Sequence, residues 1–425
     1  MSVLVVTTEP LPFPGVPVTG AGLRAWALVQ GLRTRGLEAE PAIAADAVRH
    51  LSPEQVEPLK PFLFERSQLP DHVRARKPDA LVMQHWGLMD RLGPVDCPLA
   101  IDLAGPHLLE RHFWGSAHPE RDLADKLAAL RRADFLTCSG RRQRLYFLGF
   151  AMQGGFDPAD PDLLPVIPFS VSPQLPSQRE FDPTAFVYAG LLLPWQDPSR
   201  GLEALLRVLE RRNRGHLTFI GATHPAGDVS RGQFDSILQR IQASNHASLE
   251  PARAFTQLQE DLTRFGVAWD LMALNAEREL AFPSRTVVYL SCGLPVVTQA
   301  GHELADWIVQ YNAGWCLDPA SPSENLETFV ERLLDAPDEI AGKRENARRL
   351  VREQFTWDRT IAPLADWCRN PTRRAGKDLP NIQTDEALQA LRRESEQIRE
   401  SLQELQGRRL VRLSNLLRQI GITRG

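Results

Sequence analysis

The segment ERELAFPSRTVVYLSCGLPVV, residues 277–297, joins a charged cluster to an apolar helical pattern and to a Gly-Leu-Pro turn that leads into a β-branched strand. In α/β proteins, ligands gather where the carboxyl ends of parallel strands meet helix N-termini. Free backbone N–H groups and the helix dipole favour phosphate there. The segment therefore predicts an α/β protein with an anion-binding edge close to Arg285 and Thr286.

The same alternation of strand and helix extends along the chain in both directions. The strands read as continuous apolar runs, which is typical of parallel sheets buried on both faces. We predict strands at Val3–Thr7, Glu38–Ile43, Ala80–Gln84, Leu99–Leu103, Phe135–Ser139, Leu164–Ile167, Phe186–Ala189, Leu217–Ile220, Val267–Met272 and Pro295–Thr298. The stretch from Gln153 to Pro183 is rich in Pro, Gly and Asp and has little periodicity, so it is the predicted linker between two α/β halves.

Length and composition narrow the class of protein. A chain of 425 residues is long enough for two domains, and its net charge of −4 gives no overall attraction to nucleic acid. The five cysteines are scattered without metal-ligand spacing, and the N-terminus reads as a first strand rather than a signal peptide. No run of about 20 apolar residues occurs. We expect a cytoplasmic protein with no bound metal.

Five segments in order resemble GT-B glycosyltransferases of the family-four kind, the large group that builds lipopolysaccharides, exopolysaccharides and other glycoconjugates. They are TGAGLRAWALVQGLRTRGLEAE from Thr19, VIPFSV from Val166, FVYAGLLLPWQDP from Phe186, SCGLPVVTQAGHELADWIVQYNAGWCLDP from Ser291 and FTWDRTIAPLADWC from Phe355. The resemblance implies two Rossmann-like, doubly wound domains with a C-terminal helical extension. Residues 1–165 would form the acceptor domain and 166–354 the nucleotide-sugar domain, with 355–370 crossing back to the first domain and 371–425 forming the extension.

The chain departs from this family at its acidic pair and at its basic loop. The family has two glutamates eight positions apart where this chain has Leu280 and Val288. The Arg and Lys that hold the diphosphate are missing from the loop LLLPWQDPSR, and the nearest basic residues are Arg200 and Arg285. The combination of ERELAF, RTV, CGLPV and PWQDP resembles a divergent bacterial branch that is often found in polysaccharide clusters.

Candidate donor-binding residues follow from these departures. Arg285 and Thr286 are placed to bind the diphosphate, because a guanidinium fork matches phosphate geometry. The alternative is that Arg285 pairs with Glu277 or Glu279 and caps a helix. Glu279 is the stronger candidate of the two for binding sugar hydroxyls, although a solvated helix turn would carry the same charges.

Four further positions complete the predicted donor site. Gly20 and Gly22 allow close backbone approach to a ligand, although tight turns need glycine in any case. Asp306 stands where the family often has a glutamate, and it is as consistent with a residue that starts or stabilises a helix. Arg200 is the second basic candidate.

The catalytic candidates lie in the first half. His85 follows a predicted strand, a position that faces the cleft in this fold. Asp102 ends the next strand and His107 follows it, and the resemblance implies that a histidine or an acid here contacts the sugar or the acceptor. The sequence does not choose between Asp102 and His107, and either is also consistent with a satisfied polar group in a loop. Trp114 and Trp195 are candidates for stacking on sugars, but Trp is more often packed in a core.

These residues and the resemblance lead to one predicted function and two alternatives. We predict a nucleotide-sugar-dependent glycosyltransferase, of hexosyl or deoxyhexosyl type, that acts on a glycan or lipid-linked glycan without a metal cofactor. The resemblance implies retention of anomeric configuration. The main alternative is a non-catalytic GT-B protein that binds a partner or a glycan. An epimerase of related fold is a third and weaker alternative.

The C-terminal extension has its own pattern. Thr384 is a predicted N-cap for a helix over Asp385–Leu405, and that helix carries an a/d stripe of apolar residues. The last segment is rich in arginine and leucine and has no acids. The heptad stripe makes the first segment a candidate for a short coiled coil with a second copy or a partner. The last segment is consistent either with contact with an anionic membrane surface or with a helix packed on its own protein or on a partner.

Overall fold

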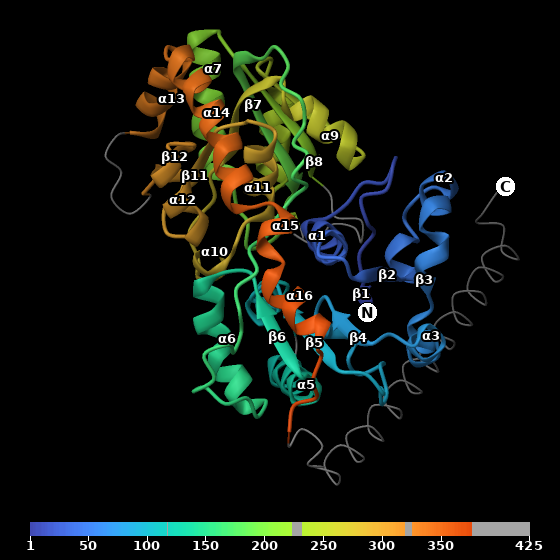
Figure 1. The fold of residues 1–425 in the computed structure, drawn as a ribbon. Coiled ribbons are helices and arrows are strands. Elements are labelled where there is room, and N and C mark those ends of the chain that lie inside the picture. Colours follow the sequence, from blue (N-terminus) through green and yellow to red (C-terminus); the bar gives the residue numbers. More distant parts are fainter. Residues whose placement is uncertain (117, 223–231, 319–324, 376–425) are drawn as a thin grey trace, which may run out of the picture. The chain divides into compact units, whose positions relative to one another are not determined.

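Two parallel six-stranded sheets with flanking helices form the described part of the chain (Figure 1). The computed structural model describes residues 1–116, 118–222, 232–318 and 325–375. Each sheet has its first strand in a central position and grows outward in both directions, which is the strand order of a doubly wound fold. The predicted α/β class with two Rossmann-like halves is confirmed. The predicted helix over Asp385–Leu405 lies outside the described residues.

The first sheet has the order β3-β2-β1-β4-β5-β6, with every pairing parallel. Its strands are β1 (Ser2–Thr7), β2 (Glu38–Ala44), β3 (Leu63–Phe64), β4 (Ala80–Met83), β5 (Leu99–Leu103) and β6 (Phe135–Cys138). Its α-helices are α1 (Gly20–Thr34), α2 (Pro53–Val56), α3 (Leu69–Arg76), α4 (His107–Phe113), α5 (Pro119–Arg132) and α6 (Arg141–Gln153). Short 3-10 helices occur at η1 (Ala45–Val48), η2 (Glu57–Phe62), η3 (Arg66–Gln68) and η4 (Trp86–Leu88).

The second sheet repeats this order as β12-β11-β10-β7-β8-β9. Its strands are β7 (Asp182–Leu191), β8 (His216–Ala222), β9 (Ala247–Glu250), β10 (Phe265–Asp270), β11 (Val296–Gln299) and β12 (Gly314–Leu317). The helices that follow are α7 (Ser199–Arg212), α8 (Asp235–Ala243), α9 (Phe255–Leu262), α10 (Ala276–Leu280), α11 (Ser284–Ser291), α12 (Glu303–Tyr311), α13 (Leu326–Leu334), α14 (Pro337–Gln354), α15 (Trp357–Thr360) and α16 (Ala362–Arg369).

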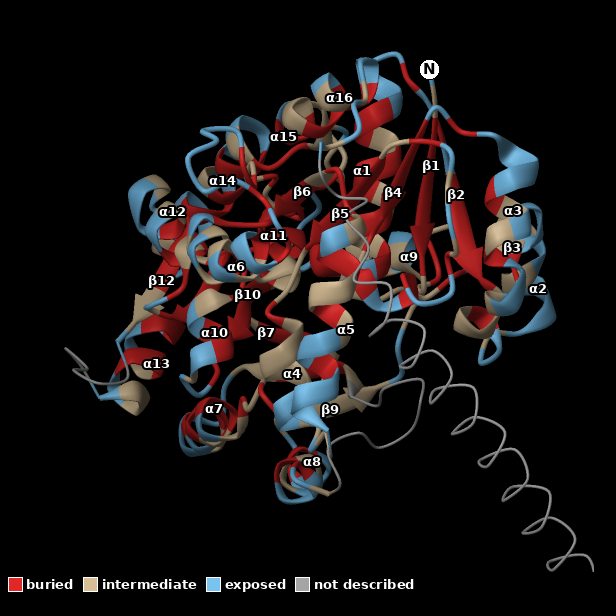
Figure 2. Cartoon of the chain, turned by 90° about the horizontal axis from the view of Figure 1, so that it is seen from below, coloured by how far each residue is buried: buried red, intermediate tan, exposed pale blue. Residues whose placement is uncertain are grey.

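Each sheet is buried between helices that have one buried face and one exposed face. Figure 2 shows the central strands in the colour of buried residues, whereas several helices turn an exposed face outward. In α7 the leucines of one face pack with β7, β8 and β10, while Arg207 and Arg211 face solvent and pair with acids of α13. Apolar burial of this kind is the main stabilising term for the fold.

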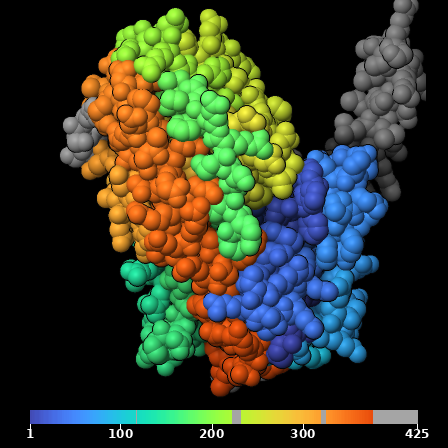
Figure 3. Space-filling model, turned by 45° about the horizontal axis from the view of Figure 1, so that its top comes forward, coloured from blue at the N-terminus to red at the C-terminus, as the bar shows by residue number. Residues whose placement is uncertain are grey.

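The linker between α6 and β7 is fixed against the second half. Arg344 on α14 donates to Gln178 Oε1 (3.2 Å), and Arg348 donates to the carbonyl of Pro176 (2.7 Å). Figure 3 shows this green segment running along the surface beside the orange helix α14. The predicted strand at Leu164–Ile167 is wrong. Val166 makes a single bridge to Cys138, and Leu164 has a φ of 56°, which interrupts an extended conformation.

The last described helices return to the first sheet. Ile361, Leu364 and Cys368 lie in the same buried cluster as Val3 and Leu28. Gly31 on α1 makes this approach possible, because a Cβ there would stand 2.8 Å from Ile361. Among the residues that the structure describes, none belongs to a helix with the length and apolar character needed to cross a membrane.

Candidate functional site

The guanidinium of Arg285 lies at the carboxyl edge of the second sheet. It donates to the carbonyl of Leu191 (3.1 Å) and to Gln196 Oε1 (3.0 Å). Its Cζ lies 4.5 Å from the ring centroid of Tyr188. Gly190 makes room for it, because a Cβ at that position would stand 2.6 Å from Arg285 Nε. A cation from α11 thus lies at the end of β7, directly before the PWQDP loop that lacks a basic residue of its own.

Asp270, at the end of β10, anchors this arginine. Its Oδ1 lies 3.5 Å from Arg285 NH1, and its Oδ2 accepts a 2.5 Å hydrogen bond from Thr286 Oγ1. Burial raises the pKa of Asp270, while Arg285 and Thr286 act in the opposite direction. Thr286 is fully buried and faces Asp270, so its hydroxyl positions the carboxylate that holds Arg285.

A tyrosine separates two strands beneath this cluster. The hydroxyl of Tyr289 accepts from the N–H of Ala189 (2.6 Å) and donates to the carbonyl of Ala189 (3.0 Å). The register between β7 and β10 accordingly ends at Val187 and Ala268. The two strands therefore diverge just where Arg285 and Asp270 face each other, which is the kind of crevice in which open α/β sheets bind ligands.

The two glutamates of α10 have different environments. Glu277 is buried and its carboxylate pairs with Arg278, with 2.7 Å between Oε1 and NH2. Burial raises the pKa of Glu277, and the charge of Arg278 opposes this shift. Glu279 has an exposed side chain. Arg285 pairs with neither of them, so the alternative in which it caps a helix through Glu277 or Glu279 does not describe this structure.

Asp306 and Arg200, two other predicted donor residues, are both exposed. Asp306 lies in the first turn of α12, but the N-cap of that helix is His302, whose Nδ1 accepts from the N–H of Ala305 (3.1 Å). Burial lowers the pKa of His302 to about 3, so this imidazole is neutral. Arg200 lies in the first turn of α7. No contact of either residue joins it to Arg285.

The N-terminus of α1 meets that of α11. A Cβ at Gly20 would collide with Ser284 Oγ, so glycine is required for this approach, and Arg285 is the next residue along α11. Thr19 caps α1 by accepting from the N–H of Gly22 (3.2 Å) and donates to Glu9 Oε2 (2.7 Å). The structure brings Gly20 close to the arginine cluster. Gly22 instead packs against the backbone of the Pro10 loop.

The two predicted histidines of the first half are neighbours. The rings of His85 and His107 lie 4.3 Å apart, edge to face. His85 has a φ of 143°, a strained conformation for a residue other than glycine, and its Nδ1 accepts from the N–H of Gly87 (2.9 Å). Burial lowers the pKa of His85 well below its usual value, and the charges of His107, Lys126 and Arg111 add to this effect.

A series of aromatic contacts connects these histidines to the second half. The ring of His107 lies 6.4 Å from Trp114, and Trp114 lies 5.3 Å from Trp195 of the PWQDP loop. The carbonyl of Trp195 accepts from Asn275 Nδ2 (2.9 Å), which fixes the loop to α10. Trp195 is buried, so the packing interpretation holds for it, and Trp114 is only partly buried.

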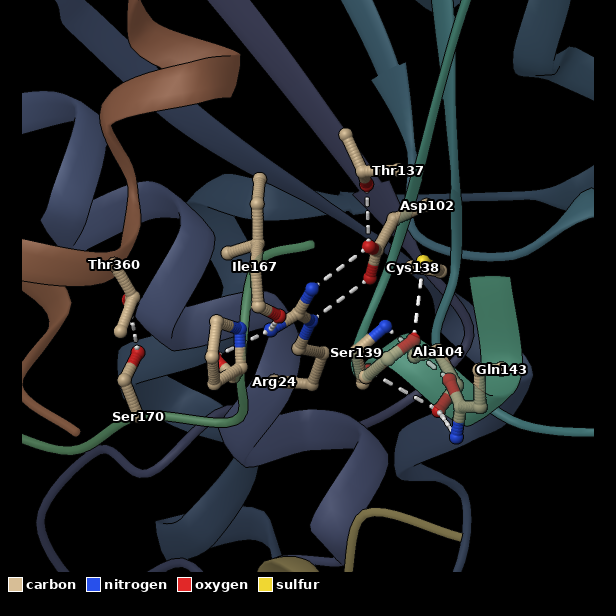
Figure 4. Close-up of polar contacts among 12 residues, drawn as sticks. Arg24, Asp102, Ala104, Thr137, Cys138, Ser139, Gln143, Ile167, Ser170 and Thr360 are labelled. Atoms are coloured by element: carbon tan, nitrogen blue, oxygen red, sulfur yellow. Dashed lines mark hydrogen bonds and ion pairs between the residues drawn. The ribbon is translucent and has the colours of Figure 1, made fainter. Parts of the chain in front are cut away.

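Asp102 is part of the core, contrary to its predicted contact with a substrate (Figure 4). Arg24 donates to both of its oxygens, at 2.9 and 2.8 Å, and Thr137 donates to Oδ1 at 2.6 Å. Arg24 NH1 also donates to the carbonyls of Ile167 (2.7 Å) and Pro168 (3.0 Å). Through Arg24, the buried carboxylate therefore ties α1 and the linker to the first sheet, and no hydrogen bond joins it to either histidine.

Sequence reasoning missed Arg24 and Gln196 in these networks, and it also missed Glu110, whose Oε2 lies 3.0 Å from His107 Nδ1. A charged residue inside the apolar pattern of α1 was a visible signal for Arg24, since a buried charge needs a partner. Gln196 stands in the quoted PWQDP loop, but only the fold brings it to Arg285. Within the described ranges, no group of three or more His, Cys, Asp or Glu residues is arranged to hold a metal ion.

Comparisons with known proteins agree with this architecture. Residues 200–366 match the family described as "Glycosyl transferase-like". A sucrose-phosphate synthase from Thermosynechococcus elongatus superposes with a TM-score of 0.59 at 14% identity, covering 87% of this chain and 98% of that one. The chain has the GT-B fold.

Two further solved GT-B structures give the same result. Anabaena Alr3699/HepE in complex with UDP-glucose has a TM-score of 0.59 at 14% identity, covering 86% of this chain and 98% of its own. An alpha-glucosyltransferase in complex with UDP has a TM-score of 0.58 at 11% identity, covering 87% of this chain and 100% of its own. No curated protein matches the sequence. In this GT-B chain the Arg285 cluster belongs to the half that matches the glycosyltransferase-like family, and the histidine pair belongs to the other half.

Proposed function

We propose that this GT-B protein is a glycosyltransferase that moves a sugar from a nucleotide-sugar donor to a hydroxyl of a glycan or glycoconjugate. The observation that carries the proposal is the position of Arg285. A guanidinium from α11 stands over Gly190 at the end of β7, next to the loop from which the usual basic residues are missing. The family match over residues 200–366 supports the same activity.

The role of Arg285 follows from the negative charge that the reaction places on the leaving group. When the bond between the sugar and the diphosphate breaks, negative charge grows on the leaving phosphate, and a fixed cation stabilises it. Arg285 is held in place by Leu191, Gln196 and Asp270, so little reorganisation is needed when that charge appears. The adjoining N-termini of α1 and α11, at Gly20 and Ser284, add positive helix dipoles.

The donor and the setting are proposed from similarity. Two structural neighbours are complexes with UDP-glucose or UDP, so a UDP-hexose is the first donor to test. Resemblance to the polysaccharide-cluster branch favours a glycan or lipid-linked glycan acceptor, retention of configuration and a cytoplasmic location. It also favours a metal-independent reaction, with Arg285 in place of a cation. Contact with a membrane, a second copy or a partner is assigned to residues 371–425.

The first experiment screens UDP-, GDP-, TDP- and CDP-sugars for thermal stabilisation and for release of nucleoside diphosphate. We expect at least one donor to raise Tm and to be turned over. Arg285→Ala should lower kcat/KM by roughly 10- to 100-fold, since a charge-assisted hydrogen bond contributes about 1.5–3 kcal/mol. Arg285→Lys should recover part of this loss. Arg352→Ala, which removes a surface ion pair, is the control and should change nothing.

A non-catalytic GT-B protein is the second candidate, and one observation favours it. Two arginines of this edge already face a carboxylate, Arg285 facing Asp270 and Arg278 facing Glu277. Such pairing weakens the net attraction for a diphosphate. If no donor in the panel changes Tm or is hydrolysed, and Arg285→Ala leaves the biological function intact, the enzymatic proposal is wrong and this candidate replaces it.

A further inference from the structure

Glu110 holds the imidazole of His107 from within the same helix. Its Oε2 lies 3.0 Å from His107 Nδ1, three residues earlier on α4. Both side chains are largely shielded, with 20% and 23% of their surfaces exposed. A charge-assisted contact of this length in a poorly solvated place fixes both the rotamer and the proton of a histidine.

The contact determines which ring nitrogen carries the proton. An ionised carboxylate only accepts hydrogen bonds, so Nδ1 must be the donor, and in the neutral ring Nε2 is then left with its lone pair. Among the residues that the structure describes, Nε2 of His107 has no hydrogen-bond partner. Nε2 of His85 is fully buried and has no partner in the described part of the chain, whereas Nε2 of His107 is not fully buried. His107 thus presents one accessible acceptor atom.

Packing holds the ring in this orientation. The ring centroid of His107 lies 4.3 Å from that of His85 and 5.8 Å from that of Trp86, and both contacts are edge to face. His85 is itself fixed, by its bond from Gly87 and by its strained backbone. Such strain persists where the surroundings impose a conformation, and it concentrates at functional sites.

Gly105 provides the space in which Glu110 lies. A Cβ at Gly105 would stand 2.9 Å from Glu110 Oε1, which is closer than real side chains approach. The sequence GPHLLE, residues 105–110, therefore encodes the histidine, its carboxylate and the space for that carboxylate in one turn. The helix α4 also contacts α10, the helix of Glu277 and Arg278 in the second half.

We propose that Glu110 is a positioning residue: it fixes the tautomer of His107 so that Nε2 accepts a hydrogen bond from a sugar hydroxyl of the substrate. The proposal rests on the proposed function for its substrate class. It adds a residue that acts through His107 and touches no substrate itself. A neutral hydroxyl is the matching ligand, because a lone pair on Nε2 attracts an O–H donor and repels an anionic oxygen.

The first test uses the full chain and the nucleotide sugar that the wild type turns over in the panel above. Glu110→Gln and Gly105→Ala should each lower kcat/KM by roughly 10-fold, the loss expected for one misoriented hydrogen bond. His107→Ala should cost at least as much, and adding Glu110→Gln to it should cost nothing more. Glu120→Gln, an exposed carboxylate on α5, is the matched control and should behave as wild type. Wild-type kinetics for Glu110→Gln, or full additivity with His107→Ala, would overturn the proposal.

The second test does not depend on turnover. The ¹⁵N chemical shifts of the His107 ring, assigned by comparison with His107→Ala, report its tautomer. We expect the Nδ1–H form in the wild type and a shift toward the Nε2–H form in Glu110→Gln, with unchanged Tm. An Nε2–H form in the wild type contradicts the positioning role. If no donor is turned over but the tautomer behaves as expected, the proposed function fails and the positioning by Glu110 stands.

Discussion

Buried charges in this protein are paired in two different ways. Arg24 and Asp102 form a network in which each guanidinium nitrogen and each carboxylate oxygen has a partner from the protein. Arg285 is held more loosely, with a 3.5 Å approach to Asp270 and a side-chain partner, Gln196, that a ligand can replace. The first arrangement suits a structural role, whereas the second leaves hydrogen-bonding capacity for a substrate.

Asp102→Asn tests the structural role. We expect it to reduce the free energy of unfolding by about 3–5 kcal/mol, because it leaves Arg24 buried without its counter-charge. The measurement is urea denaturation. Asp366→Asn, at an exposed ion pair, should cost less than about 0.5 kcal/mol. A variant Asp102→Asn with wild-type stability and no activity would instead support the catalytic role predicted from the sequence.

At the scale of helices, α5 and α6 enclose a buried lysine. Lys126 has no exposed surface, and its Nζ has no hydrogen-bond partner among the residues that the structure describes. It lies 4.0 Å from the ring centroid of Phe150 and 4.4 Å from that of Phe147. Burial lowers the pKa of Lys126 to about 7, so the uncharged amine predominates in the folded protein only above about pH 7.

The stability of the fold should therefore depend on pH through this residue. Between pH 7 and about pH 10.5 the unfolded chain binds the proton and the folded protein does not, so the free energy of unfolding rises as pH rises through this window. The gain is at most on the order of 5 kcal/mol. Lys126→Met should abolish most of this rise, as measured by denaturation at pH 7, 8.5 and 10. An unchanged pH slope in the variant would show that Lys126 is not the group responsible.

Most strands were predictable because each is a continuous apolar run buried on both faces, as in β1, β4 and β10. The strand β9, with the sequence ASLE, was not predicted because it lies at the edge of the sheet and all four residues are only half-buried. Leu164–Ile167 has the composition of a strand, yet a positive φ at Leu164 leaves it with one bridge. Local pattern thus identified interior strands and was unreliable at the edges.

For the molecule as a whole, the chain passes twice between the two sheets, once in the linker before β7 and once after α14. Backbone hydrogen bonds join these two segments. Val171 donates to the carbonyl of Phe355 (2.9 Å) and accepts from the N–H of Trp357 (3.0 Å). A second connection joins α12 and α6, where Glu303 Oε2 accepts from the N–H of Arg142 (3.2 Å). The two halves are thus linked both by backbone and by side chains.

The returning helices should contribute to the stability of the first half. Leu364→Ala removes a fully buried side chain that packs with Val3 and Leu28, so we expect a loss of about 2–5 kcal/mol. Val309→Ala, at an exposed apolar position of α12, should cost little and is the control. Chemical denaturation measures both. Equal, small losses in the two variants would mean that α16 does not stabilise the first sheet.

The sequence by itself determined the α/β class, the two repeated halves and the presence of Arg285, Gly20, His85 and His107 at strand and helix ends, because hydrophobic periodicity and turn residues are local properties of the chain. Only the tertiary structure decided how these residues are used. It buried Asp102 against Arg24, placed Arg285 over Gly190 and beside Gln196, and set His107 between His85 and Glu110. Charge pairing, desolvation and hydrogen-bond geometry depend on neighbours from distant parts of the chain, and the fold alone brings those neighbours together.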